Sequence, residues 1–272
     1  MLILHRFINS RFARTACNRL MQCPRCEVAL YTISFNNPQV VELQIQLIKQ
    51  FLSDQFVHIV CDNSPDTEAR ALIKAVCEHY RIPLIALPPN PWSGIHPSMP
   101  HGCALNWVVH NMLPFFPAEV TGFLDHDIFP VTRTSIIQTM QQHSFYGLPQ
   151  QRKALTYLWP GFFFAKQALL RHKRIDFSPS WYGDTGVRLH QILAKPGVET
   201  LHASQDDILF TTVIPSAPAD AMFFMHDNAW LHVRNASGWQ QAKPPTDRIV
   251  SLLRNKSHTP DLRLSVSKAS AQ

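Results

Sequence analysis

Two aspartates stand at the end of an apolar run, in the stretch "GFLDHDIFP" at residues 122–130. Side chains two residues apart on a strand point to the same face. The carboxylates of Asp125 and Asp127 would therefore converge there, and they would repel each other unless a cation or a proton lies between them. Carboxylate oxygens suit Mg²⁺ or Mn²⁺, and Mg²⁺ is commonly held by one or two carboxylates together with substrate phosphates. The spacing predicts a divalent metal site, with a helix cap and a solvated turn residue as the alternative roles.

The elements that must position these carboxylates alternate along the first half of the chain. Apolar, β-branched runs predict strands at residues 28–35, 56–62, 82–87 and 120–127. Helical spacing predicts helices at residues 38–52, 64–80 and 103–116, with Ser64 as the N-cap of the second. This order predicts the α/β class, with a doubly wound, mostly parallel sheet. Ligands bind outside the carboxyl ends of such strands, which is where Asp125 and Asp127 lie.

The second half of the chain is less regular. It predicts a helix at 134–143, a strand at 144–150, a loop-rich region around Trp159 and Trp181, a helix at 184–194, and late strands at 222–227 and 229–233. We expect one domain over residues 28–245, made of the regular first half at 28–130 and a less regular second half at 131–245.

Positive charge is concentrated at the two ends. The formal net charge is +6, yet residues 28–233 carry 13 basic and 16 acidic side chains. We therefore expect a basic extension at 1–27, a basic tail at 246–272 and no nucleic-acid partner. Basic ends suit peripheral contact with an anionic membrane surface or an acidic partner, or they only aid solubility.

The cysteine pattern and the lack of a long apolar run favour a cytoplasmic location. Six cysteines are scattered without a compact disulfide framework, and no apolar run is long enough to be a transmembrane segment. Residues 1–22 contain four arginines and no acidic residue, which is typical of an organelle transit peptide. The alternative is a disordered or mis-assigned start, with Met21 as the true first residue. Cys23 and Cys26 form half of a zinc site or are two unrelated thiols.

Five stretches together resemble a known family. "LYTISFNNP", "IVCDNSPD", "FLDHDIFP", "WPGFFFAKQAL" and "WLHVRNASGW" occur in that order over roughly residues 28–240. The set is similar to GT-A-fold glycosyltransferases, closest to family 2, with their Asp-x-Asp metal motif. The resemblance implies transfer of a sugar from a nucleotide-diphosphate sugar, a UDP-sugar being favoured, to a glycan, lipid-linked or other hydroxyl acceptor. It also implies a requirement for Mn²⁺ or Mg²⁺. In a catalytic domain of this kind, residues 28–130 would be the nucleotide-binding half and residues 131–245 the acceptor-side half.

The resemblance assigns metal ligands. A cation on Asp127, with Asp125 bracing the metal or the ribose, would stabilise negative charge on the departing diphosphate. His232 is a candidate third ligand, because imidazole tolerates Mn²⁺, or it is a core histidine.

Strand ends supply candidates for holding the nucleotide. Thr32, Ser34 and Asn36 lie at the end of the first predicted strand and could face the base or ribose. Asp62 ends the second strand and could bind uracil or ribose, or it is a turn residue with local hydrogen bonds.

An inverting transfer needs a general base for the acceptor hydroxyl. Asp184 is the best candidate, with Trp181 and Tyr182 offering faces for a sugar ring. Its alternative role is the N-cap of the predicted helix. Asp206 and Asp207 are weaker candidates, and a retaining enzyme would need no such base.

Two other functions compete with this one. A sugar-phosphate nucleotidyltransferase has a similar sheet, but it usually opens with a glycine-rich, arginine-containing loop, and "SFNNPQV" contains neither residue. A non-catalytic nucleotide- or glycan-binding protein on the same fold is the other alternative.

Overall fold

The computed structural model describes residues 7–8, 26–93, 98–114, 116–172, 175–208 and 223–233. The strands are β1 Cys26–Ser34, β2 Phe56–Asp62, β3 Leu84–Ala86, β4 Ala118–Asp125, β5 Ile128–Pro130, β6 Phe145–Arg152, β7 Leu155–Lys166, β8 Thr200–His202, β9 Gln205–Ile208, β10 Phe223–His226 and β11 Trp230–Val233. The helices are α3 Pro38–Phe51, α4 Thr67–His79, α5 Met99–Asn111, α6 Ile136–Met140, α7 Gln167–His172, the 3₁₀ turn η1 Val187–Leu189, and α8 His190–Leu193. The basic tail at 246–272 and most of the basic extension at 1–27 lie outside the described residues.

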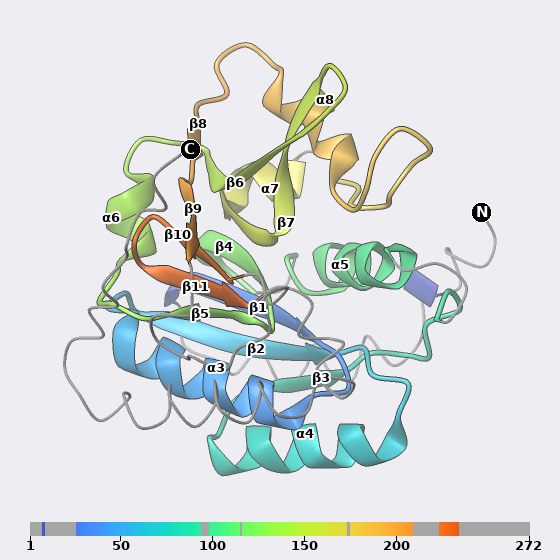
Figure 1. The fold of residues 1–272 in the computed structure, drawn as a ribbon. Helices are drawn as coiled ribbons and strands as arrows, with labels where there is room; N and C mark the ends of the chain where they lie inside the picture. The colour runs from blue at the N-terminus through green and yellow to red at the C-terminus, as the bar shows by residue number, and fades with distance from the viewer. Residues whose placement is uncertain are drawn as a thin grey trace.

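A seven-stranded sheet in the order β3-β2-β1-β4-β7-β6-β8 forms the centre of the molecule (Figure 1). Strands β3, β2, β1 and β4 are parallel to one another, and β7 pairs antiparallel with both β4 and β6. Because β8 is parallel to β6, only β7 runs against the common direction. The predicted doubly wound, mostly parallel α/β sheet is therefore confirmed.

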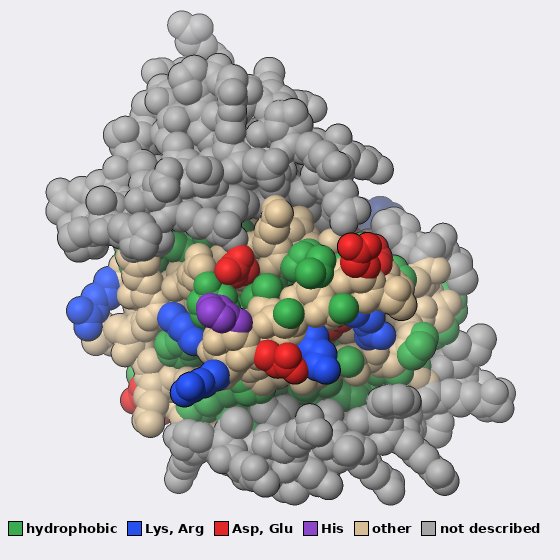
Figure 2. Space-filling model, turned by 90° about the horizontal axis from the view of Figure 1, so that it is seen from below, with side chains coloured by type: hydrophobic (Ala, Val, Ile, Leu, Met, Phe, Trp, Pro, Cys, Tyr) green, Lys and Arg blue, Asp and Glu red, His purple; other side chains and the backbone are tan. Residues whose placement is uncertain are grey.

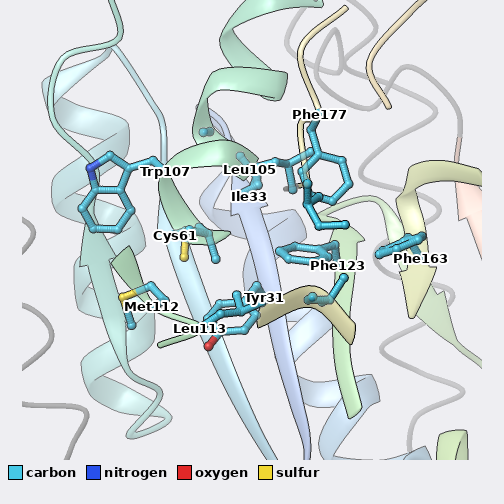
Figure 3. Packing of buried hydrophobic residues seen from close by; sticks show 14 of the residues in the cluster. Tyr31, Ile33, Cys61, Leu105, Trp107, Met112, Leu113, Phe123, Phe163 and Phe177 are labelled. Atoms are coloured by element: carbon cyan, nitrogen blue, oxygen red, sulfur yellow. The ribbon is translucent and has the colours of Figure 1, made fainter. Parts of the chain in front are cut away.

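Helices cover both faces of the parallel half. In Figure 1, α3 and α4 lie on one face and α5 lies on the other. Apolar side chains alternate along β1 accordingly: Leu30 packs with Ile48 of α3, whereas Tyr31 joins the cluster that contains α5. Figure 3 shows Tyr31, Phe123, Phe163 and Phe177 gathered beside α5, and the Phe123 ring centroid lies 5.3–6.1 Å from those of the other three. These aromatic contacts add to the burial that joins β1, β4 and β7 to the segment that contains Phe177.

Part of the predicted N-terminal extension belongs to this core. Phe7 is buried in the cluster around α5, and the Asn111 side chain donates a hydrogen bond to the Ile8 carbonyl at 2.9 Å. The segment therefore contacts the domain at residues 7–8.

Helix starts differ from the sequence prediction for a local reason. Asp66, and not Ser64, caps α4, because its carboxylate accepts from the backbone N–H groups of Glu68 and Ala69. The Ser64 hydroxyl instead donates to Asp62. The helix predicted at 103–116 begins at Met99, with Pro100 in its first turn, where the missing N–H of proline costs no helical hydrogen bond.

The predicted loop-rich region around Trp159 is wrong, because these residues belong to the long strand β7. Its pairing with β6 shifts between two registers, Gly147↔Phe163 and Pro149↔Leu158. Leu148 alone therefore stands opposite the stretch from Trp159 to Phe162. A bulge accommodates Pro160, which could not donate to a regular ladder. The helix predicted at 184–194 is likewise reduced to η1 and the four-residue α8.

A smaller sheet in the order β5-β11-β10-β9 lies beside the carboxyl end of β4. Strand β5 follows β4 after a two-residue turn, and it pairs antiparallel with β11 in the register His232↔Ile128. Ile128 and His232, which are 104 positions apart in the sequence, are thereby brought side by side.

Charged side chains are mixed over the face that α3 and α4 cover. Figure 2 views the molecule from that side and shows Lys and Arg interspersed with Asp and Glu over the described part of the face. Lys74 and Glu78 of α4, for example, lie 3.7 Å apart. No helix in the described part of the chain is long and apolar enough to cross a bilayer.

Candidate active site

The two predicted carboxylates lie at the carboxyl end of β4, but only one of them is on the strand. Asp125 is the last residue of β4, and Asp127 lies in the turn before β5. The prediction that both project from one strand face is therefore wrong. The turn changes the chain direction, so that each carboxylate meets a different histidine.

Asp127 faces His232, as the sequence prediction required. The Asp127 carboxylate oxygen lies 3.9 Å from Nε2 of His232, and both side chains are almost buried. The Val233 N–H also donates to the Asp127 carbonyl at 3.0 Å. The imidazole of His232 stacks on the indole of Trp159, with ring centroids 5.0 Å apart. These contacts from β7 and β11 fix both groups in place.

Asp125 pairs with His101, a residue that the sequence prediction missed. Oδ1 of Asp125 lies 3.0 Å from Nε2 of His101, which belongs to the first turn of α5. Burial lowers the pKa of His101, but the charge and hydrogen bond of Asp125, with smaller contributions from Asp184 and Asp127, outweigh it and raise that pKa. Burial raises the pKa of Asp125, but His101 and, more weakly, His126 and His232 lower it overall.

The His101–Asp125 pair predicts a pH-dependent contribution to stability. A raised pKa means that His101 stabilises the fold below its ordinary 6.5 and loses this effect as the pH rises through its folded pKa. A lowered pKa means that Asp125 contributes above its ordinary 3.8 and loses this effect as the pH falls. We expect His101→Gln to lower the free energy of unfolding by about 1 kcal/mol at about pH 5.5 and by clearly less at about pH 8.5. The effect is small because the two side chains are about a quarter exposed and solvent screens their charges.

Urea denaturation of the native chain and of His101→Gln, at both pH values and with a chelator present, measures this loss of stability. A destabilisation that grows with pH would contradict the assignment of the proton to His101.

The histidine between the aspartates ties the turn to β1. The Phe35 N–H donates to Nδ1 of His126 at 3.2 Å, so this nitrogen carries no proton. Burial lowers the pKa of His126 to about 4, which keeps the ring neutral. His126 therefore has a structural role in holding the turn.

Gly161 makes room for the Asp125 carboxylate. A Cβ at this position would lie 2.7 Å from Oδ2 of Asp125 and 2.3 Å from the Trp159 ring. The bulge in β7 thus brings backbone, without a side chain, against the end of β4. Bulges of this kind commonly occur next to active sites.

The predicted nucleotide-contacting residues are divided between the surface and the interior. Thr32 is fully buried and its hydroxyl bonds to α3, so it lies beneath the strand ends. Ser34 is also buried and donates to Asp62 at 3.2 Å. Asn36 is partly exposed with φ 49°, a conformation that asparagine tolerates. Its N–H donates to the Ser64 hydroxyl.

The Asp62 carboxylate is buried and accepts several hydrogen bonds from neighbouring residues. Its carboxylate accepts from Ser34, from the backbone and hydroxyl of Ser64, and from Arg70 at 3.1 Å. Arg70 also donates to the carbonyls of Asp62 and Leu87. The arrangement joins the ends of β1, β2 and β3, which gives Asp62 a structural role whether or not it also contacts a ligand.

Asp184 is exposed, in the turn that precedes η1. Its carboxylate accepts from the Thr185 N–H at 2.7 Å, and Thr185 donates to the Ser98 carbonyl at the start of α5. Gly186, with φ 84°, is the cap of η1, so the predicted N-cap role of Asp184 is wrong. The hydrogen bond to Ser98 places this turn at the start of α5, whose first turn also contains His101. The charge of Asp184 contributes to the raised pKa of His101.

The aromatic residues before Asp184 are exposed to different degrees. Trp181 is 89% exposed and packs edge-on against the partly buried Tyr182, with Lys153 5.8 Å from its ring centroid. Asp206 and Asp207 lie on β9, opposite Met225 and Phe224. They are on the smaller sheet and not in the turn that holds Asp184.

Among the described residues, candidate metal ligands come close to one another only in pairs. No three histidine, cysteine or acidic side chains among them are gathered closely enough to hold a metal ion. Asp127 and His232 are nevertheless 3.9 Å apart, which is less than twice a metal–ligand bond of roughly 2.1 Å. The donor set, one carboxylate and one imidazole, suits Mn²⁺ if a ligand supplies the remaining oxygens. The residues therefore fit a cation that is shared with a bound phosphate group.

Comparison with known proteins finds similarity in structure and none in sequence. No protein-family model matches the chain, and no curated protein matches its sequence. The structure resembles the mannosyltransferase PcManGT from Pyrobaculum calidifontis, solved in complex with GDP-Man and Mn²⁺, with a TM-score of 0.50 at 12% identity. This match covers 74% of the present chain and 64% of that chain, so the likeness spans somewhat less than two thirds of PcManGT.

Two further structures match less well. S. aureus TarS gives a TM-score of 0.42 at 18% identity, over 65% of this chain and 35% of that one. The galactosyltransferase LgtC, in complex with donor and acceptor sugar analogues, gives 0.38 at 11% identity, over 54% and 60%. With the sheet order described above, the match to PcManGT shows that this chain has the GT-A fold.

Proposed function

We propose that the chain is a metal-dependent glycosyltransferase that moves a sugar from a nucleotide-diphosphate sugar to a hydroxyl acceptor. One observation carries the proposal: on a GT-A fold, Asp125 ends β4, Asp127 lies in the turn that follows, and Asp127 faces His232 at 3.9 Å. Open α/β sheets bind ligands outside the carboxyl ends of their strands, which is where these candidate cation ligands lie. Assignment to family 2, a UDP-sugar donor and a cytoplasmic location remain predictions.

Asp127 and His232 would hold the cation, and Asp125 would brace it or the ribose. A bound Mn²⁺ or Mg²⁺ supplies positive charge that neutralises the diphosphate as the sugar–phosphate bond breaks. Because no three candidate ligands are gathered among the described residues, oxygens of the diphosphate would have to complete the coordination. We therefore expect weak Mn²⁺ binding to the chain alone and much tighter binding in the presence of a nucleoside diphosphate.

The donor nucleotide would lie at the ends of β1 and β2. Asn36 is the exposed member of the predicted set, and its backbone is held by Ser64. Ser34 and Asp62 form the floor beneath it through their mutual hydrogen bond. Thr32 lies deeper and acts through its partner on α3.

Asp184 would take the proton of the acceptor hydroxyl in an inverting transfer. Its carboxylate is exposed, and its turn packs against the start of α5, next to His101. Trp181 and Tyr182 are in the same turn and would bind the sugar rings of a glycan or lipid-linked acceptor through their faces.

A thermal-shift screen tests the proposed function. The chain is heated with UDP, GDP and their sugar conjugates, each with Mn²⁺ and with EDTA. A nucleotide-dependent rise in the melting temperature that EDTA removes, together with slow release of nucleoside diphosphate from one donor, is the expected result. Stabilisation without turnover of any donor would indicate a binding protein, and formation of diphosphate from a nucleoside triphosphate and a sugar phosphate would indicate a nucleotidyltransferase.

The base assignment predicts that Asp184→Asn lowers kcat for transfer by roughly 100-fold or more and leaves donor binding unchanged. Asp206→Asn is the matched control, because Asp206 lies on the smaller sheet, and it should keep native kcat. Transfer and donor hydrolysis are measured separately with the donor found in the screen. If only the Asp206 variant loses activity, or if the Asp184 variant transfers sugar at the native rate, Asp184 is not the general base.

A further inference from the structure

Gln44 is a buried polar residue on the apolar face of α3. It is fully buried, between Val41 and Ile48 along the stripe that faces the sheet. A buried amide is costly unless both its donor and its acceptor are satisfied. The Gln44 amide nitrogen donates to the carbonyls of Asp125, at 2.7 Å, and Ile128, at 2.9 Å. One side chain thus joins the two ends of the turn that contains Asp127.

A directional hydrogen-bond chain fixes the orientation of this amide. Both partners of the Gln44 nitrogen are carbonyl oxygens, which only accept, so the amide oxygen must point the other way. There it accepts from the Thr32 hydroxyl at 2.8 Å, and Thr32 in turn lies 2.9 Å from Nε2 of His58. Since the hydroxyl proton is already used, Nε2 of His58 must be the donor.

His58 suits this role because it stays neutral. The ring is almost fully buried, and burial, with a smaller effect of Lys49, lowers its pKa to about 3. A neutral imidazole with its proton on Nε2 donates to Thr32 at every physiological pH.

The remaining residues of the turn are anchored from other elements. His126 accepts from the Phe35 N–H, and the Asp127 carbonyl accepts from the Val233 N–H. Gln44 adds a side-chain hydrogen bond to each end of the turn.

We infer that Gln44 is a positioning residue that sets the directions of the Asp125 and Asp127 carboxylates, and that Thr32 and His58 set the orientation of its amide. The expected effect on Mn²⁺ binding rests on the proposed glycosyltransferase activity, whereas the effect on the geometry of the turn does not. Thr32 then acts by orienting Gln44 and not by contacting the nucleotide.

Three substitutions test the inference. Thr32→Val and Gln44→Met remove the hydrogen bonds with little change in volume, and Thr32→Ser restores the hydroxyl. Thr121→Val is the matched control, because Thr121 is a fully buried threonine on the neighbouring strand β4 whose hydroxyl has no hydrogen-bond partner among the described residues. Mn²⁺ is titrated into each chain in the presence of saturating UDP or GDP.

We expect Thr32→Val and Gln44→Met to weaken Mn²⁺ binding roughly 10- to 100-fold, the range for residues that orient metal ligands. Thr32→Ser and Thr121→Val should bind Mn²⁺ as the native chain does. Native affinity in Thr32→Val, or an equal loss in Thr121→Val, would overturn the positioning role.

The native chain could fail to bind Mn²⁺ both with UDP and with GDP, and this failure would remove the proposed function. Nitrogen NMR of the histidine rings then tests the positioning role by itself, because it needs neither the metal nor a nucleotide. In the native chain His58 should be neutral, with its proton on Nε2. The ring signals of His126 should move in Thr32→Val and Gln44→Met but not in Thr121→Val. Unmoved His126 signals in both variants would overturn the inference.

Discussion

Asp127→Asn should abolish Mn²⁺-dependent nucleotide binding, with a loss in affinity of at least roughly 100-fold. The substitution keeps the shape of the side chain but removes the charge that faces His232. The turn should survive, because its anchor is the Asp127 carbonyl, which accepts from Val233 and is unchanged. Calorimetric titration of UDP and GDP, with and without Mn²⁺, measures the effect.

Asp66→Asn is the control for this experiment. Asp66 caps α4 through its side-chain oxygen, and asparagine caps as well as aspartate. The control chain should therefore keep native affinity. If folded Asp127→Asn binds nucleotide with Mn²⁺ as tightly as the native chain does, Asp127 is not a ligand of the cation.

Gly161→Ala should lower kcat about 100-fold, the cost of misplacing a reacting group by about 1 Å. The new methyl group would lie 2.7 Å from Oδ2 of Asp125 and 2.3 Å from the Trp159 ring, so one of them must move. Trp159 stacks on His232, so its displacement would disturb the proposed cation site as well. Overpacking should also cost roughly 1–3 kcal/mol of stability.

Gly197→Ala separates these two effects. A Cβ at Gly197 meets nothing within 4 Å, but φ is +77°, so alanine is strained there by roughly 1 kcal/mol. This variant should lose stability without losing kcat. If Gly161→Ala keeps native kcat at a temperature where both variants are folded, the bulge in β7 does not position Asp125.

The first half of the fold was predictable because its signals are local. Strands β1, β2 and β4 are long apolar runs, and α3 and α4 show helical spacing between them, so their order alone indicated a parallel sheet. The ends were less accurate, as Pro100 shows. A proline looks like a break in the pattern, yet it fits within the first turn of α5.

The second half was less predictable because long-range pairing determines it. Residues Trp159–Gly161 contain the signals of a loop, but pairing with β4 and β6 on either side holds them in β7 as a bulge. The helix predicted at 184–194 fails at its start for a local reason, because Gly186 has φ 84°, which is outside the helical region.

The site was predictable in part. The spacing of Asp125 and Asp127 at a strand end indicated where it lies, and His232 was nominated from its sequence context and does face Asp127. His101 and Gln44 were missed, because nothing in the sequence shows that α5 begins early or that a buried glutamine reaches two carbonyls 81 and 84 residues away. A glutamine within an apolar helical stripe was the one available signal.

Anomalous diffraction from crystals grown with Mn²⁺ and a nucleotide sugar tests the central claim most directly. We predict one manganese peak within bonding distance of Asp127 and His232, with the remaining contacts made by the two phosphates of the donor. A peak elsewhere, or an empty corner with Asp127 turned toward solvent while the donor is bound, would contradict the account.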